Sequence, residues 1–584
     1  MTRLSSLFLV CFFLRLNADA QMFTRVTDPT NPIVSDRFNS GGGSWADFNN
    51  DGFLDLFVAN GNDTSMNNSL YLNNRNGNFI KVIGGAIVND GGTSIGGTWG
   101  DYNNDGKHDV FVTNRQFTTP FGNFFYRGNG DTVFTKVTTG APATDMANSN
   151  SSSWVDVNGD GALDLFVVNF QSNNYLYYNS GPPAYTFARP DTGDIVLDGT
   201  TFSIVGVWAD YNNDRKPDLF IGNAGNQNDF LFTNGGNGTF AKSTFADARS
   251  TLGASWGDYD NDGDPDLFVA NYLGQNNLLY RNSGPPGYAL TRMDTGVVSN
   301  DGGFSVGSVW GDVDNDGDLD LFVCNDGQNN AMYLNSGPPG YGFSKVTVGA
   351  IVNDGGASFG CAAADFDNNG SLDLFVANRL GRQNFLYLNN GNSNSWVNIT
   401  CVGATNRSGI GTKVRVRSNV GGIVRWQTQE LSAQSGYNSQ TLSLHFGLGD
   451  ANIIDSVRLE WQSGATETFV NLATNQNIMF EEGVGPTNVG RGSLVMPTGF
   501  MLHQNYPNPF NPVTTISLTV PTRENVSLKV FDILGRDVAT LIQSVREAGG
   551  HSVNVDASEW GSGVYLYRLT VGNFTQTKQM LLIK

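Results

Sequence analysis

The segment DVDNDGDLD, residues 312–320, is followed at once by the strand-like run LFVCN, residues 321–325. Closely spaced Asp residues around a single Gly are typical of a tight loop that holds a cation. The same pattern occurs seven times, with starts 48 to 55 residues apart. The copies are DFNNDGFLD from Asp47, DYNNDGKHD from Asp101, DVNGDGALD from Asp156, DYNNDRKPD from Asp210, DYDNDGDPD from Asp258, DVDNDGDLD from Asp312 and DFDNNGSLD from Asp365. A repeat of this length indicates one structural unit used seven times.

Each repeat contains four short strand patterns. The first loop is followed by LFVAN at 56–60, NSLYLNN at 68–74 and NFIKV at 78–82, and a Gly- and Ser-rich run then leads to the next loop. One four-stranded unit cannot bury both of its faces, and no helical periodicity interrupts the series. We therefore predict an all-β fold: a seven-bladed β-propeller over residues 21–394, then a small β domain and a C-terminal β-sandwich.

Two further features support a closed ring. A Trp lies two residues before six of the loops and Ala363 before the seventh, and large aromatic side chains at such positions are expected to pack between blades. These residues are Trp45, Trp99, Trp154, Trp208, Trp256 and Trp310. Phe23–Val26 is similar to Phe134–Val137, yet it precedes the first complete repeat. We infer that this N-terminal strand completes the last blade and removes an exposed sheet edge.

The repeated loops are predicted to bind Ca²⁺. Side chains at positions 1, 3, 5 and 9, with the backbone carbonyl at position 7, can converge on one cation, and Gly at position 6 permits the sharp turn. Oxygen ligands favour Ca²⁺ over zinc or copper, which prefer His and Cys. The predicted ligands, loop by loop, are Asp47, Asn49, Asp51 and Asp55; Asp101, Asn103, Asp105 and Asp109; Asp156, Asn158, Asp160 and Asp164; Asp210, Asn212, Asp214 and Asp218; Asp258, Asp260, Asp262 and Asp266; Asp312, Asp314, Asp316 and Asp320; Asp365, Asp367, Asn369 and Asp373.

A metal-free turn capped by Asp and Asn side chains is the alternative for any single loop. The seven loops carry 25 Asp, which repel one another unless neutralised, so we predict up to seven Ca²⁺ ions. Loops five and six, the richest in Asp, are expected to bind most strongly. In loop four Arg215 replaces the Gly, and Arg215 with Lys216 could supply positive charge instead of a metal. In loop seven Asn369 replaces an Asp, which predicts weaker binding.

Charge excludes some classes of partner. The 584 residues include 54 Asp and Glu against 34 Lys and Arg, a net charge of -20. Nucleic acids and anionic membrane surfaces require a positive patch, so neither is expected as a partner. Residues 22–390 contain 40 Asp, no Glu and 18 Lys and Arg, so the acidity belongs to the repeats.

The first 20 residues are predicted to be a signal peptide. Arg3 precedes an apolar run from Leu7 to Leu14, and Ala18-Asp19-Ala20 resembles a cleavage site. The run is shorter than the roughly 20 apolar residues of a membrane span, and no later segment qualifies. We therefore expect export and no transmembrane segment.

Two more residue sets repeat at fixed distances from the loops and are expected at the other mouth of the propeller. The Asp set is Asp36, Asp90, Asp145, Asp198, Asp247, Asp301 and Asp354; the Asn set is Asn60, Asn114, Asn169, Asn223, Asn271, Asn325 and Asn378. Capping of turns by short polar side chains is one interpretation. A polar rim that binds a ligand is the other.

Over residues 22–390 the repeats resemble the FG-GAP and VCBS repeats of integrin-alpha-type propellers. The loop pattern and the strand runs after it carry this resemblance. It implies that the calcium loop joins the first two strands of each blade. It also implies adhesion or ligand binding, with an extracellular protein or glycan as partner.

Residues 395–482 resemble the ASPIC/UnbV domain of the cartilage acidic protein family. The resemblance is carried by NRSGIG at 406–411, GYNSQ at 436–440, FGLG at 446–449 and WQSG at 461–464. Gln462 departs from the family, which more often has Pro after that Trp. The resemblance implies a small β domain that supports or extends the binding surface, followed by a linker at 483–499.

Residues 500–584 are similar to the C-terminal sorting domain of type IX secretion cargo. The matching pieces are HQNYPNPFNP at 503–512, DILGR at 532–536, GSGVY at 561–565 and KQMLLIK at 578–584. The resemblance implies the type IX secretion machinery as a partner. It places the protein outside the cell or on the outer-membrane surface of a Gram-negative bacterium of the Bacteroidetes and Chlorobi type.

Together these observations predict a secreted or cell-surface calcium-binding β-propeller that mediates adhesion or ligand binding. The alternative is an extracellular polysaccharide-degrading lyase or hydrolase on a calcium propeller scaffold. Only four His occur, Glu is absent before Glu430, and neither a nucleophile elbow nor H-E-x-x-H is present. We therefore expect a binding protein and no enzymatic activity.

Overall fold

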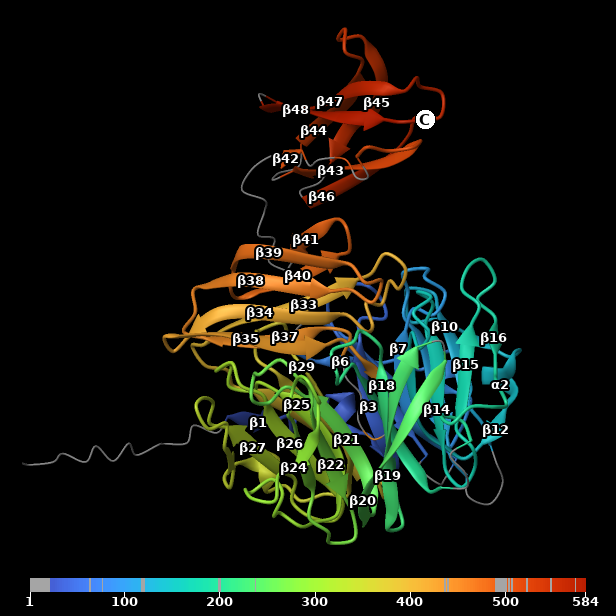
Figure 1. Cartoon of the computed structure of the whole chain (residues 1–584), viewed down its shortest axis with the longest axis vertical. Helices are drawn as coiled ribbons and strands as arrows, with labels where there is room; N and C mark the ends of the chain where they lie inside the picture. The colour runs from blue at the N-terminus through green and yellow to red at the C-terminus, as the bar shows by residue number, and fades with distance from the viewer. Residues whose placement is uncertain are drawn as a thin grey trace, which may run out of the picture. The chain divides into compact units, whose positions relative to one another are not determined.

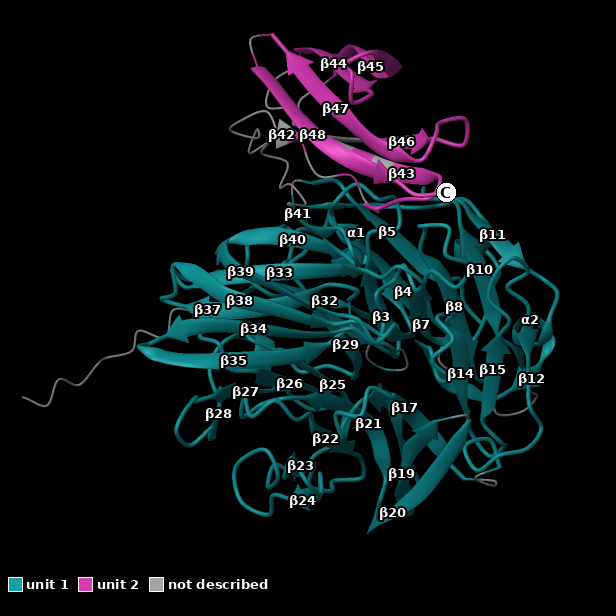
Figure 2. Ribbon diagram, turned by 45° about the horizontal axis from the view of Figure 1, so that its top comes forward, with its two compact units in different colours: residues 1–488 teal, residues 489–584 magenta. Residues whose placement is uncertain are grey.

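The structure is a computed structural model. It describes residues 22–584 apart from 62–64, 76, 117–120, 198–200, 237, 435–436, 438–440, 489–500, 503–504, 506–507, 521–523, 547–548 and 573. The predicted signal peptide lies outside the described residues. The chain divides into two compact units, residues 1–488 and 489–584 (Figure 2).

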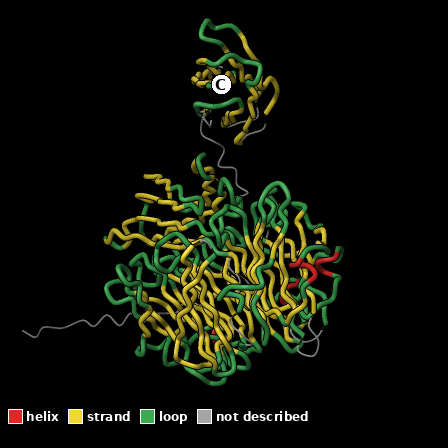
Figure 3. The backbone as a smooth tube through the Cα atoms, turned by 45° about the vertical axis from the view of Figure 1, so that its right-hand side comes forward, coloured by secondary structure: helices red, strands yellow, loops and turns green. Residues whose placement is uncertain are grey.

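Strands dominate the described residues, and helices are limited to single turns (Figure 3). The turns are α1 (Pro32–Ser35), α2 (Ala141–Thr144), η1 (Ala86–Val88) and η2 (Ala350–Val352). None of the helices described is long and apolar enough to cross a membrane. The prediction of an all-β fold is confirmed.

Within the described part of the first unit, seven four-stranded antiparallel sheets follow one another along the chain. Their inner strands are β3 (Ser40–Ala46), β7 (Ser94–Gly100), β13 (Ser149–Val155), β17 (Ser203–Ala209), β21 (Thr251–Gly257), β25 (Ser305–Gly311) and β29 (Ser358–Ala364). The second strands are β4 (Asp55–Asn60), β8 (Asp109–Asn114), β14 (Asp164–Asn169), β18 (Asp218–Asn223), β22 (Asp266–Asn271), β26 (Asp320–Asn325) and β30 (Asp373–Asn378).

The outer half of each sheet is formed by two shorter strands. The third strands are β5 (Ser69–Asn73), β10 (Phe124–Gly128), β15 (Tyr175–Asn179), β19 (Gln227–Gly236), β23 (Leu278–Asn282), β27 (Ala331–Asn335) and β32 (Phe385–Asn389). The outermost are β6 (Phe79–Lys81), β11 (Phe134–Val137), β16 (Phe187–Ala188), β20 (Thr239–Arg249), β24 (Leu290–Arg292), β28 (Phe343–Lys345) and β1 (Phe23–Arg25). Two small ribbons pair β2 (Arg37–Phe38) with β31 (Arg382–Gln383) and β9 (Phe121–Gly122) with β12 (Met146–Ala147).

The sheets close into a ring. Each inner strand contacts the inner strand of the next sheet, and β29 of the last sheet contacts β3 of the first. The N-terminal strand β1 pairs with β32, with Phe23 opposite Asn389 and Arg25 opposite Tyr387. The predicted closure of the last blade by the N-terminal strand is therefore confirmed. Strand β1 thus supplies the fourth, outermost strand of the last sheet, the place that β6 holds in the first.

The Trp residues before the loops pack between neighbouring sheets, as predicted. Trp45 is fully buried and stacks on Phe366 of the preceding repeat, with ring centroids 5.3 Å apart. Its indole N–H donates to the carbonyl of Ala362 at 3.3 Å. The centre of the ring is also filled, because Ile95, Ile204, Val306 and Phe359 from four inner strands form one apolar cluster.

The rest of the first unit is a second domain, residues 395–488. Its strands are β33 (Ser395–Val402), β34 (Lys413–Val420), β35 (Ile423–Glu430), β36 (Ala433–Gln434), β37 (Leu444–Gly449), β38 (Ile453–Glu460), β39 (Thr466–Ala473), β40 (Gln476–Glu481) and β41 (Gly485–Asn488). Two four-stranded sheets, ordered β37-β33-β40-β41 and β35-β34-β38-β39, enclose a core of Val, Ile, Leu and Phe side chains. Strand β41 lies within the predicted linker, whose residues 489–499 are outside the described residues.

The second domain lies against the ring of blades (Figure 1). Strand β36 pairs with β13 and adds a fifth strand to the third sheet. Tyr437, just beyond β36, joins the apolar cluster at the centre of the ring and makes an edge contact with Phe359 at 5.0 Å. Its hydroxyl accepts a hydrogen bond from Arg115 at 3.0 Å. The second domain thus inserts an aromatic side chain into the propeller channel.

The C-terminal unit is a separate pair of sheets. Strands β42 (Met501–Leu502), β43 (Val513–Val520) and β46 (Gly549–Asp556) form one sheet, and β44 (Glu524–Phe531), β45 (Asp537–Arg546), β47 (Gly563–Val571) and β48 (Phe574–Leu582) form the other. Leu518, Val530, Tyr567 and Met580 lie in its buried core. This arrangement matches the predicted β-sandwich.

Candidate metal centre

The predicted ligands all lie in the hairpin that joins the inner strand of each blade to the second strand. Position 1 directly follows the inner strand, and position 9 is the first residue of the second strand. The seven loops therefore lie at one end of the propeller. We call this the loop end, and the other mouth the opposite end.

Position 1 organises the loop backbone. In loop six, Asp312 Oδ1 accepts the N–H of Asp316 at 3.0 Å and Oδ2 accepts the N–H of Gly317 at 2.7 Å. Gly317 has φ +92°, which a glycine adopts without strain. Equivalent bonds recur in loop one from Asp51 and Gly52 to Asp47, at 2.9 and 2.8 Å.

Position 9 places a buried carboxylate beneath each loop. Asp55, Asp218 and Asp373 have no exposed surface, and one oxygen of each accepts a backbone N–H at 2.7–2.8 Å. The other oxygen, Oδ2, of these three residues has no partner at ordinary hydrogen-bond geometry, whereas the same atom of Asp109, Asp164, Asp266 and Asp320 accepts the N–H of position 2 at 3.0–3.2 Å. Each Oδ2 thus receives at most one hydrogen bond, and a carboxylate oxygen has a further lone pair available to a cation.

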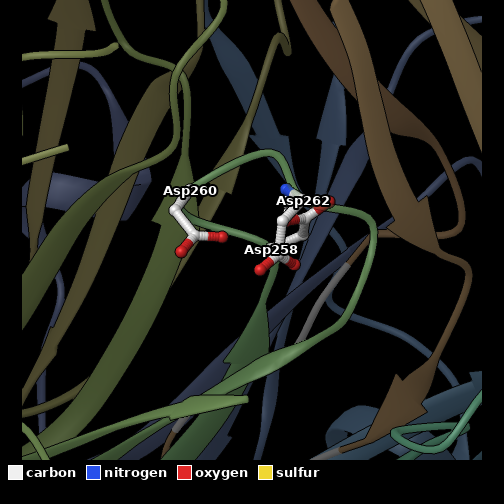
Figure 4. Close-up of side chains that lie close together, drawn as sticks. All are labelled: Asp258, Asp260 and Asp262. Atoms are coloured by element: carbon white, nitrogen blue, oxygen red, sulfur yellow. Dashed lines mark hydrogen bonds between the residues drawn. The ribbon is translucent and has the colours of Figure 1, made fainter. Parts of the chain in front are cut away.

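Three loops bring carboxylates close enough to share one ion. In each group the carboxylate oxygens lie within 4.8 Å of one another. Among the described residues the groups are Asp258, Asp260 and Asp262; Asp312, Asp314 and Asp316; Asp365, Asp367 and Asp373. Figure 4 shows the first group, in which the side chains of Asp258 and Asp262 lie together and Asp260 points toward them. Loop seven, expected to be weaker, forms such a group as well.

Burial changes the acidity of these carboxyls. It raises the pKa of Asp55, Asp164 and Asp218 to about 8, with nearby carboxylates adding to the effect. Burial and the neighbouring Asp carboxylates also raise the pKa of Asp258 and Asp312 well above the usual range. A carboxylate that is costly to ionise gains most from a cation placed beside it.

Loops one to three present fewer charges. In each, the amide of the Asn at position 3 donates to Oδ2 of the Asp at position 5, as in the 2.8 Å bond from Asn158 to Asp160. In loop one, Arg75 also pairs with Asp51 at 3.0 Å. In loop five, Arg281 lies 2.5 Å from Asp260 and covers the outer side of the cluster.

Loop four is neutralised in part by a residue that the sequence did not reveal. Arg215 has φ +66°, and its side chain turns away to the carbonyl of Gly464 and the hydroxyl of Thr466. Lys413 of β34 is buried instead, with Nζ 3.0 Å from Asp210 Oδ2. Glu430, also in the second domain, accepts the N–H of Asp210 at 3.1 Å. Lys216 also pairs with Asp214 at 3.3 Å. Cations of the propeller and of the second domain therefore both neutralise loop four.

The second domain contacts five other loops at their backbones and outer oxygens. Ser408 accepts the N–H of Asp101 in loop two, and Gln462 donates to the carbonyl of Asp156 in loop three at 3.4 Å. These contacts, like those of loop four, join residues far apart in sequence. In loops five to seven, the donors are Arg415 to Gly263 O at 3.4 Å, Arg425 to Asp318 at 2.8 Å and Asn398 to Asp365 at 2.9 Å.

At the opposite end the repeated Asp residues are paired within each blade. Asp90 Oδ2 accepts the Tyr126 hydroxyl at 2.6 Å and lies 2.9 Å from Lys136 Nζ. The same three-residue arrangement is found at Asp36 with Tyr71 and Lys81, Asp145 with Tyr177 and Arg189, Asp247 with Tyr280 and Arg292, Asp301 with Tyr333 and Lys345, and Asp354 with Tyr387 and Arg25. Asp198 lies outside the described residues.

The repeated Asn residues are also committed to the fold. Asn60 Oδ1 accepts the Ser40 hydroxyl at 2.9 Å, and its amide donates to the carbonyl of Asn67 at 3.1 Å. A Ser or Thr at the start of the inner strand makes the equivalent bond in every blade. These contacts favour the structural interpretation of both residue sets over a ligand-binding rim.

The donor chemistry of the loop end fits a hard divalent cation. The converging atoms are carboxylate, amide and backbone oxygens, the ligand types that Ca²⁺ prefers. His108 is the one His in a loop; burial lowers its pKa to about 4. The aspartate clusters are therefore suited to hold a metal ion through oxygen atoms.

Family comparisons agree with this architecture. The FG-GAP-like repeat model matches residues 26–112, 156–221, 210–269, 258–323 and 312–376, which span more than half of the chain. The model described as ASPIC and UnbV matches residues 403–487, and the secretion system C-terminal sorting domain matches residues 504–584. The three resemblances inferred from the sequence are confirmed. The sorting domain indicates secretion or surface display and points to the type IX secretion machinery.

Individual relatives are more distant. Human cartilage acidic protein 1 is 24% identical over 532 residues, covering 80% of this chain and 76% of that protein. An Agrocybe aegerita lectin that recognises non-reducing terminal N-acetylglucosamine is 16% identical, with TM-score 0.38, and the match covers 60% of this chain and 90% of the lectin. PorZ, a surface component of the type IX secretion system of Porphyromonas gingivalis, is 11% identical, with TM-score 0.35, over 91% of this chain and 58% of PorZ.

Proposed function

The chain belongs to the FG-GAP-like repeat proteins, and from that premise we propose that it is a secreted or surface-displayed β-propeller that binds Ca²⁺ in its repeat loops. We further propose that the calcium-stabilised ring mediates adhesion by binding an extracellular protein or glycan. The residues assigned to Ca²⁺ are those at positions 1, 3, 5 and 9 of the loops.

One observation carries the calcium proposal. In loops five, six and seven, three carboxylates place oxygen atoms within 4.8 Å of one another. Like charges this close repel one another unless a cation neutralises them. A divalent cation in the loop would neutralise these carboxylates together.

Counting bound ions tests the proposal. The full chain is stripped with a chelator, exchanged into metal-free buffer and titrated with Ca²⁺ by calorimetry. We expect about five to seven ions per chain, because most loops keep a full oxygen ligand set. The double variant Asp312→Asn, Asp316→Asn should lose one ion, and the control Asp36→Asn, Asp90→Asn should lose none. Fewer than about two ions in the wild-type chain would mean that the loops are metal-free turns.

The position of the second domain restricts where a ligand can bind. It contacts loops two to seven and fills the channel from the loop end with Tyr437. A macromolecular ligand would therefore approach the propeller from the opposite end. There, Leu273 and Leu380 occupy equivalent places, two residues after a second strand, with φ +59° and +62° and exposures of 54% and 68%.

Exposed leucines in the left-handed region are rare, and backbone strain of this kind concentrates at functional positions. We therefore assign Leu273 and Leu380 to the ligand-binding surface. In a glycan and matrix-protein binding screen, Leu273→Ser with Leu380→Ser should lose binding without changing Ca²⁺ uptake. Leu534→Ser, at a residue 72% exposed in the C-terminal unit, is the matched control.

The proposal treats the chain as a binding protein and not as an enzyme. The Asp residues of the loop end are assigned to cations, and the described Asp residues of the opposite ring already pair with Tyr and Lys or Arg. Release of reducing ends or unsaturated sugars from a polysaccharide panel would contradict this and favour the lyase or hydrolase alternative.

A further inference from the structure

We propose that the Asn at position 4 couples neighbouring cation loops, so that loops four, five, six, seven and one take up Ca²⁺ cooperatively. The inference deepens the proposed calcium function and rests on it. Position 4 is not a predicted ligand. It is Asn in every loop except loop three, where it is Gly159, and each of these Asn has φ between +54° and +57°.

The side chain at position 4 reaches across to the next loop of the ring. Asn261 of loop five donates to the carbonyl of Gly317 in loop six at 3.0 Å and to Asp318 Oδ1 at 2.9 Å. Asn315 of loop six donates to the carbonyl of Gly370 in loop seven at 2.8 Å. Each contact fixes the peptide that precedes position 7.

The same link occurs on both sides of this pair. Asn213 of loop four donates to Asp264 of loop five at 2.5 Å, and Asn368 of loop seven donates to the carbonyl of Gly52 in loop one at 3.1 Å. Four links therefore connect five loops in one direction around the ring. Because position 7 supplies a backbone carbonyl to the ion, ordering one loop orders a ligand of its neighbour.

The described links do not extend to loops two and three, and in loop two the position-4 Asn contacts the second domain instead. The amide of Asn104 in loop two donates to the carbonyl of Thr405, and Asn104 Oδ1 accepts the N–H of Arg407 at 3.0 Å. Loop three has Gly159 and hence no side chain to send to loop four. Loops two and three are thus tied to the second domain, while the other five are tied to one another.

The Oδ1 atoms of two of these Asn side chains also contact the second domain. Asn213 Oδ1 accepts Lys413 Nζ at 2.5 Å and Arg415 Nη2 at 3.2 Å. Asn315 Oδ1 lies 2.6 Å from His445 Nε2. Asn261 has no such contact among those described. Replacing it therefore removes a link between loops without removing a contact to the second domain.

The test compares two glycine variants of the full chain. Asn261→Gly removes one link, and Gly159 shows that loop three accommodates glycine at position 4. Asn50→Gly is the matched control, because Asn50 has the same positive φ but is exposed. Both variants and the wild-type chain are stripped of metal and titrated with Ca²⁺ by calorimetry, with melting in saturating Ca²⁺ as a check of folding.

We expect a Hill coefficient above 1 for the wild-type chain and for Asn50→Gly. In Asn261→Gly it should fall toward 1, with apparent affinity weakened roughly fivefold at the affected loops, the lower end of usual coupling energies. Superimposable titrations of the two variants would overturn the inference while leaving calcium binding intact. No Ca²⁺ uptake by the wild-type chain would remove the proposed function as well. If Asn261→Gly does not fold, Asn368→Gly tests the link from loop seven to loop one, with Asn477→Ala as its control because Asn477 of the second domain donates to Asn368 Oδ1 at 3.3 Å.

Discussion

The two ends of the propeller use the same residue in opposite ways. At the loop end, Asp258, Asp260 and Asp262 crowd together, and their neighbours are mostly other carboxylates. At the opposite end, Asp90 has its own tyrosine hydroxyl and its own lysine within 3 Å. At the loop end the carboxylates outnumber the cations that pair with them, whereas at the opposite end each described Asp is neutralised by its own blade.

Local pairing at the opposite end helps a region of charge -22 to form a compact ring. The described Asp residues of the opposite end are balanced locally, so most of the excess negative charge lies in the loops, which hold 25 of the 40 Asp. Lys413 and Arg425 of the second domain offset part of it at loops four and six. The remainder is available to divalent cations, which makes the stability of the loop end dependent on solution conditions.

Removing Ca²⁺ should destabilise the loop end and leave the opposite end unaffected. At tenfold its Kd, each bound ion adds about 1.4 kcal/mol to the free energy of unfolding, so five sites add about 7 kcal/mol. Chelation should therefore lower the melting temperature of the first unit by about 7 °C, because a unit of its size has an unfolding entropy of about 1 kcal/mol/K. Scanning calorimetry with and without chelator measures this. A transition that stays in place would show that the loop carboxylates are neutralised without metal.

The pH dependence of the metal-free chain should show the same asymmetry. The folded-state pKa values of Asp55, Asp164 and Asp218 are about 8, above the unfolded value of 3.8. Protons therefore bind the folded state more tightly, and this contribution is complete below pH 3.8 and is lost as the pH rises through 8. The metal-free chain should melt at a lower temperature at pH 8.5 than at pH 5.

Saturating Ca²⁺ should reverse that trend, since the ion binds only the ionised carboxylates. Melting curves at both pH values, each with Ca²⁺ and with chelator, provide the measurement. A metal-free chain that gains stability between pH 5 and pH 8.5 would contradict the raised pKa values.

The sequence predicted the repeating parts of this molecule because they depend on local patterns. Alternating strands, the loop pattern at Asp312 and the outer-strand match of Phe23–Val26 were sufficient for the blades and for ring closure. The Asp and Asn sets were placed at the correct end, but two interpretations remained open. The choice between a structural role and a ligand-binding rim depended on Tyr126 and Lys136. These residues meet Asp90 only through the register of the third and fourth strands.

The contacts of the second domain could not be predicted in this way. Lys413 meets Asp210 across 203 residues of sequence, and β36 pairs with β13 although the segment 433–434 has no strand pattern of its own. Asn261 occupies a position that is Asn in six of the seven loops, but nothing in the sequence indicates a partner outside its own loop. Only the arrangement of the loops around the ring shows that its amide reaches Gly317.

Removing one carboxylate at the loop end should have different effects with Ca²⁺ and with chelator, whereas removing one at the opposite end should not. Asp55→Asn keeps the bond from the Asn73 N–H and, at pH 9, above the raised pKa of this carboxyl, removes a buried charge. In chelator it should stabilise the chain by about 1–2 kcal/mol, and in Ca²⁺ it should destabilise it by a similar amount, because a ligand is lost. Asp301→Asn, at the opposite end, should lower stability equally in both conditions. Denaturant unfolding measures the four values, and an effect of Asp55→Asn with the same sign in both buffers would argue against a cation at loop one.

The smallest effect is expected from Tyr126→Phe, which removes one hydroxyl from the opposite end. The Tyr126 O–H bond to Asp90 is lost, but Lys136 remains 2.9 Å from the carboxylate and keeps it neutralised. A hydrogen bond whose acceptor stays partly solvated and keeps its other partner contributes about 0.5–1 kcal/mol. The loss should be the same with Ca²⁺ and with chelator, since no cation loop lies at this end. Unfolding curves in both buffers decide the matter: a loss that appears only in chelator would mean that the two ends communicate through the blade, and that the opposite end is not neutralised independently of the loops.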